Sequence, residues 1–66
     1  MLPPVQARIK YINRQYNLAL RYYQDILKTN PSFLPDPRIG IGLCYLKLGH
    51  PDKAKYAWER SIKVVS

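Results

Sequence analysis

The residues that could carry out catalysis or bind a metal are few and widely spaced along the chain. In 66 residues there are one His, one Cys and four carboxylates, which are His50, Cys44, Asp25, Asp36, Asp52 and Glu59. Nucleophilic, acid–base and metal-assisted catalysis all require several reactive groups to converge on one point. These six do not form a local metal-ligand set. We therefore expect no enzymatic activity, no bound metal and no cofactor.

Features that resemble catalytic or phosphate-binding motifs have simpler explanations. Cys44 lies in an apolar stretch, where a thiol usually packs as a small hydrophobic side chain and does not act as a nucleophile. His50 lies between a glycine and a proline in a predicted turn, where we expect a solvated or helix-capping side chain. Gly40 and Gly42 lack the preceding strand and the third glycine of a phosphate-binding loop. We expect these two glycines to allow close approach of another helix.

Composition and charge limit the class of protein further. Eleven Lys and Arg against four Asp and Glu give a net charge of +7, which favours acidic partners such as nucleic acid or acidic protein segments. A single cysteine cannot form an internal disulfide, which fits a reducing compartment. No run approaches the roughly 18 apolar residues of a membrane span, and residues 1–4 lack the apolar stretch of a signal peptide. We expect one soluble, intracellular domain.

The sequence repeats itself with a shift of 35 residues. This shift pairs Ala19 with Ala54, Leu20 with Lys55, Tyr23 with Trp58, Leu27 with Ile62 and Lys28 with Lys63. Residues 17–28 and 52–65 both have apolar residues at helical spacing, so each is predicted to be the second helix of a unit. In both, an alanine precedes a large aromatic residue by one turn, an arrangement that suits close packing of helices.

Each of these predicted helices follows another. Residues 37–48 are predicted to be helical, because Pro37 suits a first turn and Gly49 suits the left-handed cap after a helix. Pro51 then begins the next helix after a short turn. In the first unit, residues 6–12 are predicted to form a short helix. Residues 13–15 are poor helix breakers, so the alternative is one continuous helix over residues 6–28. We favour two separate helices.

The chain accordingly divides into two units. Residues 1–34 form a degenerate or truncated first repeat plus a proline-bounded linker, and residues 35–66 form a complete second repeat. Repeat units of this size do not bury their apolar faces alone, and about three are usually needed for independent stability. We therefore expect a fragment of a longer array, further repeats beside it, or self-association.

The pattern of the second unit resembles the tetratricopeptide repeat, with Gly42, Tyr45, Gly49, Ala54 and Trp58 at the family's positions. The first unit keeps Tyr16, Ala19, Tyr23 and Pro31 but has Arg14 in place of the turn glycine. The resemblance implies an all-α fold of tandem antiparallel helix hairpins, about two repeats of a right-handed superhelical array. It implies a repeat core of Tyr16, Ala19, Tyr23, Gly42, Tyr45, Ala54 and Trp58.

A narrower resemblance concerns residues 23–31 and 35–44. These are similar to a segment of the large repeat subunit of the RNA polymerase II-associated factor complex, which supports transcription elongation. The resemblance implies a scaffold for protein–protein interactions, protein partners from an elongation complex, and a nuclear location. Members of that family carry many repeats, whereas this chain has two.

The predicted helix 37–48 is apolar on more than one side. One stripe contains Ile41, Tyr45 and Leu48, and a second contains Ile39, Leu43 and Leu46. In tetratricopeptide arrays the first helices line a concave groove, so the resemblance implies a partner-binding groove of Ile39, Leu43, Leu46, Lys47, Arg8, Tyr11 and Ile12. An apolar groove suits an amphipathic or extended partner segment. The alternative is that this stripe packs on an adjacent repeat or on another copy of the chain.

Two other functions are considered. Six Tyr beside many Lys and Arg could indicate a basic nucleic-acid-binding helical module, with Tyr11, Tyr22 and Tyr56 as candidate exposed rings. The basic residues are scattered, however, which is typical of a solvated surface. Some repeats of this type bind a C-terminal carboxylate through Lys and Asn, but Pro4, Arg8 and Gly40 occupy those positions here. An isoleucine–leucine groove also offers a carboxylate no charge-assisted donors.

Overall fold

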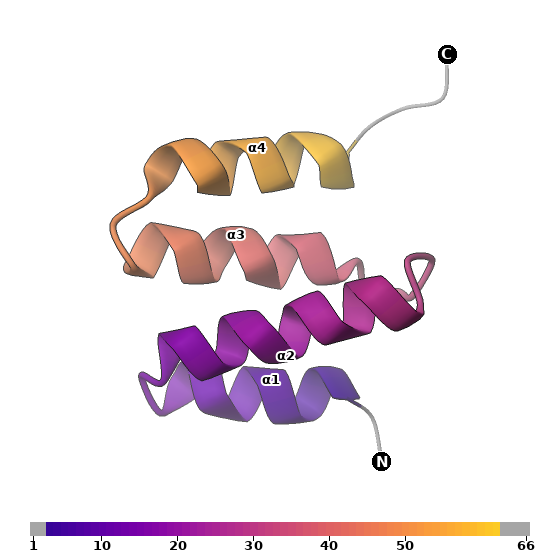
Figure 1. Cartoon of the computed structure of the whole chain (residues 1–66), viewed down its shortest axis with the longest axis horizontal. Coiled ribbons are helices and arrows are strands. Elements are labelled where there is room, and N and C mark those ends of the chain that lie inside the picture. The colour runs from indigo at the N-terminus through magenta and orange to yellow at the C-terminus, as the bar shows by residue number, and fades with distance from the viewer. Residues whose placement is uncertain (1–2, 63–66) are drawn as a thin grey trace.

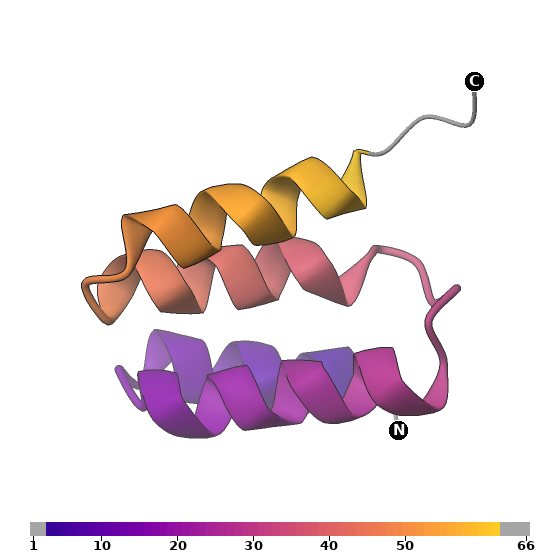
Figure 2. The same ribbon diagram turned by 45° about the horizontal axis from the view of Figure 1, so that its top comes forward.

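The computed structural model describes residues 3–62, which form four helices joined by short connections. These are α1 (Pro3–Ile12), α2 (Tyr16–Thr29), α3 (Pro37–Lys47) and α4 (Pro51–Ser61). Each helix packs antiparallel on the next along the chain, and Figure 2 shows the pairs α1–α2 and α3–α4 stacked on each other (Figures 1 and 2). The described range contains no strand. The predicted all-α fold of tandem antiparallel hairpins is confirmed.

The turn between α1 and α2 has the same geometry as the turn between α3 and α4. Arg14 has a φ of 65° and Gly49 a φ of 85°, and the two lie 35 positions apart. Gln15 N–H donates to the Lys10 carbonyl (2.9 Å), as His50 N–H does to the Tyr45 carbonyl (2.8 Å). This six-residue hydrogen bond around a left-handed residue is a Schellman cap. The first helix therefore ends before α2, as the favoured interpretation of residues 6–28 predicted. Its predicted start at residue 6 is wrong, because α1 begins at Pro3 and proline is tolerated in the first turn of a helix.

The start of α3 is fixed by its N-cap, and the end of α4 differs from the prediction. The Asp36 carboxylate accepts from Arg38 N–H (2.9 Å) and lies 3.1 Å from the Arg38 guanidinium. At the other end, the predicted helix 52–65 is wrong in extent because α4 ends at Ser61, whose hydroxyl donates to the Trp58 carbonyl (2.7 Å). Such a bond from a serine competes with the helical pattern. Ile62 is exposed, and residues 63–65 lie outside the described range.

The core consists mainly of small side chains. The buried apolar residues are Ala7, Ala19, Ile26, Ile41, Cys44, Ala54 and Ala57. Alanine at the contact lets helix axes approach closely, and this core agrees with the predicted use of Ala19 and Ala54. Ile26 and Ala57 lie outside the predicted apolar faces. The helix α2 packs on both α1 and α3, which widens its buried surface, whereas α4 packs on α3 alone among the described helices.

Two glycines of α3 receive aromatic rings from the helices on either side. A Cβ on Gly40 would overlap the Tyr23 ring of α2, and a Cβ on Gly42 would overlap the Trp58 indole of α4. Trp58 Nε1 also donates to the Ile39 carbonyl (3.2 Å). Because real Cβ atoms do not tolerate such contacts, both positions require glycine for the rings to lie where they do. The expected role of the glycines in close packing is thus explained by these two rings.

The left-handed conformation of Arg14 generates a stability prediction. A residue with a Cβ is strained at this φ, whereas glycine is not. We expect Arg14→Gly to stabilise the chain by about 0.5–1 kcal/mol, after allowing for the greater freedom of glycine in the unfolded state. Urea denaturation followed by circular dichroism measures this change.

Gly49→Ala is the matched control, since it places a Cβ on the equivalent residue of the other turn. It should destabilise the chain, because φ is 85° there and no neighbouring atom lies close enough to compensate. Unchanged or lower stability of Arg14→Gly would show that the first turn is not under this strain.

Candidate functional site

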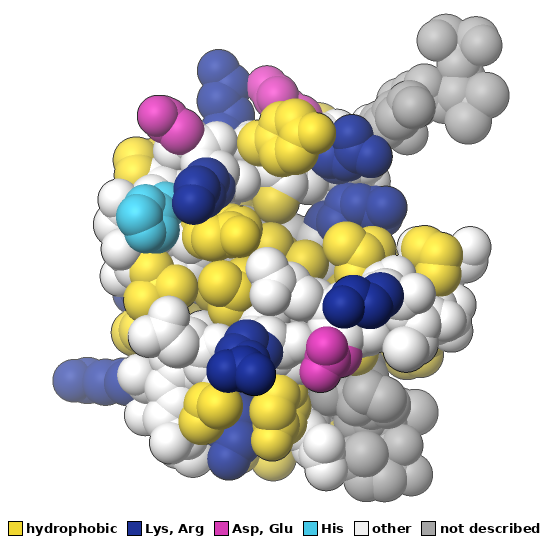
Figure 3. Space-filling view, in the orientation of Figure 1, with side chains coloured by type: hydrophobic (Ala, Val, Ile, Leu, Met, Phe, Trp, Pro, Cys, Tyr) yellow, Lys and Arg dark blue, Asp and Glu magenta, His cyan; other side chains and the backbone are white. Residues whose placement is uncertain are grey.

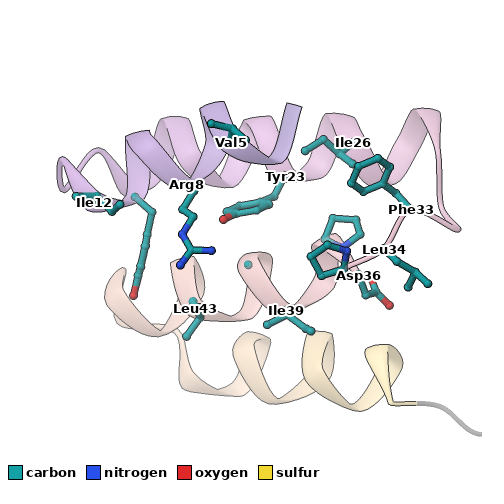
Figure 4. A pocket seen from close by; sticks show the side chains of 14 residues that line it. Val5, Arg8, Ile12, Tyr23, Ile26, Phe33, Leu34, Asp36, Ile39 and Leu43 are labelled. Carbon is teal, nitrogen blue, oxygen red and sulfur yellow. The ribbon is translucent and has the colours of Figure 1, made fainter. Parts of the chain in front are cut away.

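A groove of about 660 Å³ lies between α1 and α3 and is closed at one end by the loop that follows α2 (Figure 4). Residues from all of these elements line it: Val5, Arg8, Tyr11, Ile12, Tyr23, Ile26, Phe33, Leu34, Pro35, Asp36, Pro37, Ile39, Gly40 and Leu43. The lining is mostly apolar, with Arg8 and Asp36 as its charged members. Pockets of this size and composition are typical of ligand- and peptide-binding sites.

The structure brings five of the seven predicted groove residues together. Arg8, Tyr11 and Ile12 come from α1, and Ile39 and Leu43 come from α3. Leu46 and Lys47 are exposed at the C-terminal end of α3 but do not line the groove. Helical periodicity placed Leu46 on the same stripe as Ile39 and Leu43, and the family resemblance added Lys47, but the groove does not extend to the last turn of α3.

The loop between α2 and α3 contributes a wall that sequence reasoning missed. Residues 31–36 were interpreted only as a linker, yet Phe33, Leu34 and Pro35 line one end of the groove. Leu34 is 80% exposed, which is unusual for a leucine in a short connection. The available signal was the occurrence of two adjacent large apolar residues between prolines.

The apolar side chains of the groove remain accessible to solvent. Val5 and Ile12 of α1 and Ile39 and Leu43 of α3 are all exposed large hydrophobic residues. Isolated exposed apolar residues are common, whereas a concentration of them around one cavity marks an interaction surface. Within residues 3–62, no further element covers this side of the groove.

Tyr23 forms the floor of the groove beside Gly40. Burial raises the pKa of the Tyr23 phenol, the nearby Cys44 acts in the same direction, and the positive charge of Arg8 opposes them. The phenol therefore stays protonated at neutral pH and can donate a hydrogen bond. Figure 4 shows the ring next to the Arg8 guanidinium, so the floor presents two donors to an occupant.

The residues predicted for the repeat core have two degrees of burial. Ala19, Gly42 and Ala54 are buried, whereas Tyr16, Tyr23, Tyr45 and Trp58 are half-buried. The half-buried rings have polar or aromatic neighbours. Lys53 Nζ lies 5.6 Å from the Tyr45 ring centroid, and the Tyr11 and Tyr16 rings meet edge to face at 5.3 Å.

The rings considered for stacking on nucleic acid are mostly not available. Of Tyr11, Tyr22 and Tyr56, the first two are half-buried and only Tyr56 is exposed, at 61%. The Tyr56 hydroxyl accepts a hydrogen bond from Arg60 (3.2 Å), whose guanidinium also lies 5.6 Å from the ring centroid. On the face seen in Figure 3, Lys and Arg are separated by apolar and uncharged side chains. The structure adds no observation that favours the nucleic-acid function.

Reactive groups do not converge in the part of the chain that the structure describes. No three residues among its His, Cys, Asp and Glu lie close enough to hold a metal ion. Cys44 is buried, and burial raises the pKa of its thiol to about 11. His50 is exposed and makes no capping hydrogen bond to α4. No helix within residues 3–62 is both long and apolar enough to cross a membrane.

Comparison with curated proteins gives similarities over most of the chain. It is 51% identical over 55 residues to Tetratricopeptide repeat protein 1 of Schizosaccharomyces pombe, covering 83% of the chain and 5% of that protein. It is 37% identical over 60 residues to RNA polymerase-associated protein CTR9 of Saccharomyces cerevisiae, covering 91% and 6%. With the protein of the same name from Caenorhabditis elegans it is 34% identical over 59 residues, covering 89% and 5%.

The chain thus spans a small part, 5% to 6%, of the length of these relatives. No protein-family model matches the sequence. No solved structure matches it significantly. The relatives confirm the predicted resemblance to tetratricopeptide-repeat proteins and to an RNA polymerase-associated subunit.

The environment of Cys44 predicts low thiol reactivity. Because thiolate is the reactive form, a pKa near 11 leaves roughly 100-fold less thiolate at neutral pH than an ordinary cysteine has. We expect iodoacetamide to alkylate the folded chain at least that much more slowly than the chain in concentrated urea. Mass spectrometry of the alkylated fraction over time measures both rates. Similar rates in the two conditions would identify an accessible, reactive thiol instead.

Proposed function

We propose that this chain, whose sequence is similar to parts of Tetratricopeptide repeat protein 1 and of RNA polymerase-associated protein CTR9, is a non-catalytic scaffold for protein–protein interactions. Its groove between α1 and α3 binds a segment of a partner protein. The observation that supports this most directly is the cavity of about 660 Å³ lined by exposed apolar residues from three parts of the chain.

Binding is driven by burial of the groove's apolar side chains. Burying a fully exposed large aliphatic side chain contributes about 1.5–3 kcal/mol, and covering the exposed part of each groove side chain contributes a corresponding fraction of that value. Several such side chains lie along one cavity. The groove is open along its length and formed by two helices and a loop, which suits a segment of chain better than a compact small molecule. Leu43 lies on α3 across from α1 (Figure 4), where an occupant contacts both walls.

The partners belong to an RNA polymerase-associated assembly in the nucleus. This part of the proposal comes from the relatives, two of which are named as RNA polymerase-associated. Residues 1–34 act as the first repeat with its linker, and residues 35–66 act as the second. Further repeats, or a second copy of the chain, pack beside these units.

The role of the groove generates a prediction with a matched control. Leu43 and Leu18 are both 39% exposed, but Leu43 lines the groove and Leu18, on α2, does not. Leu43→Asp should weaken partner binding by about tenfold or more, because an anion replaces an apolar contact. Leu18→Asp should leave binding unchanged. Affinity capture from nuclear extract with the full chain, quantified by mass spectrometry for RNA polymerase-associated subunits, measures the difference.

Circular dichroism must show that both variants keep the helical fold. Equal recovery of the subunits by Leu43→Asp and the unaltered chain would contradict the groove as the binding surface. The basic nucleic-acid-binding module would be favoured instead if recovery of the subunits required nucleic acid, fell steeply with salt concentration and was unchanged by Leu43→Asp.

A further inference from the structure

Arg8 places a positive charge inside the apolar groove. Figure 4 shows its guanidinium extending from α1 into the cavity, between Ile12 on one side and Tyr23 on the other. The side chain is exposed, and within residues 3–62 it makes no ion pair and no hydrogen bond. An arginine has five N–H donors in a planar fork, so this groove contains donors that nothing in the described chain uses.

The other charge of the groove is already compensated. Asp36 pairs with Arg38 at 3.1 Å and accepts the backbone N–H of the same residue as the N-cap of α3. Arg8 has no such partner among the residues that line the groove. Arg8 is therefore free to pair with an anionic group of an occupant, and the net charge of +7 on the chain also attracts acidic segments.

A carboxylate meets this requirement better than other anions that a protein segment carries. Its two oxygens match the guanidinium fork in a bidentate arrangement. A segment that covers the apolar walls on both sides displaces water from around Arg8, which strengthens a charge-assisted hydrogen bond relative to one on the open surface. The expectation that this groove lacks charge-assisted donors is corrected by the position of Arg8.

The carboxylate must come from a side chain within the segment, because the groove continues on both sides of Arg8. Val5, Phe33 and Leu34 lie toward one end and Ile12 lies toward the other, with Leu43 across the groove from Arg8. A chain terminus bound at Arg8 would fill only one of these halves. An internal residue leaves both halves to be filled by its neighbours in the segment.

The spacing along α1 sets the spacing of the segment. From Val5 to Arg8 is about 4.5 Å of helix axis and from Arg8 to Ile12 about 6 Å, at 1.5 Å per residue. In an extended chain, side chains on the same face recur every two residues, about 6.6 Å apart. Apolar side chains two positions before and two positions after an acidic residue therefore fit the two halves of the groove.

We propose, on the basis of the groove function above, that the partner segment is extended and carries Asp or Glu flanked by large apolar residues at the second position on each side. Arg8 binds the central carboxylate, Val5, Phe33 and Leu34 contact one apolar side chain, and Ile12 and Leu43 contact the other. The apolar contacts supply affinity, and the ion pair selects the segment.

The test is selection from a random peptide library with blocked termini, displayed against the full chain. The unaltered chain should enrich peptides with an acidic residue between two large apolar residues at the stated spacing. Arg8→Glu should bind those peptides about tenfold or more weakly and should enrich Lys or Arg at the central position instead. Arg21→Glu, the same change at an exposed arginine of α2 outside the groove, should select as the unaltered chain does.

The outcomes separate this inference from the proposed function. Enrichment of apolar peptides without an acidic centre, lost in Leu43→Asp, would overturn the role of Arg8 while supporting the groove. Peptides that bind equally well to Leu43→Asp would contradict the groove itself. Binding that requires a free C-terminal carboxylate, compared directly with the same peptides amidated, would overturn the internal carboxylate.

Discussion

Two aromatic rings packed against the backbone of α3 hold this helix to the helices on either side of it. The Tyr23 ring of α2 lies against Gly40, and the Trp58 indole of α4 lies against Gly42. Glycine lowers the helical propensity of α3 by up to about 1 kcal/mol per residue relative to alanine, so the helix depends on tertiary contacts. In return, its neighbours approach more closely than any side chain at these positions would allow.

This arrangement determines which face of α3 remains open. Gly40, Ile41, Gly42 and Cys44 are buried, so the contacts with α2 and α4 are made largely by backbone and small side chains. The larger residues Ile39, Leu43 and Leu46 are left exposed. The groove is therefore a consequence of how α3 packs. Tyr23 takes part in both features, because its ring contacts Gly40 and also lines the cavity.

Much of the fold could be predicted from the sequence, because prolines and glycines act locally. Pro37 and Pro51 begin α3 and α4 as expected, and Gly49 follows the end of α3 with the positive φ of a left-handed cap residue. The equivalent role of Arg14 was harder to predict, since its conformation is set by the repeated Schellman cap and not by its own preference. Of the groove, helical periodicity together with the resemblance to tetratricopeptide repeats identified Arg8, Tyr11 and Ile12 on α1 and Ile39 and Leu43 on α3. The wall formed by Phe33 and Leu34 depends on where a loop folds back, which periodicity does not describe.

Nuclear Overhauser spectroscopy of the chain in solution can detect directly whether aromatic rings hold α3 at its two glycines. We expect cross-peaks between the Gly40 Hα protons and the Tyr23 ring, and between the Gly42 Hα protons and the Trp58 indole. Gly49, whose Cβ direction meets open space, should show no cross-peaks to the Tyr23 or Trp58 rings and serves as the internal control. A chain that has all four helices but neither set of cross-peaks would contradict the account.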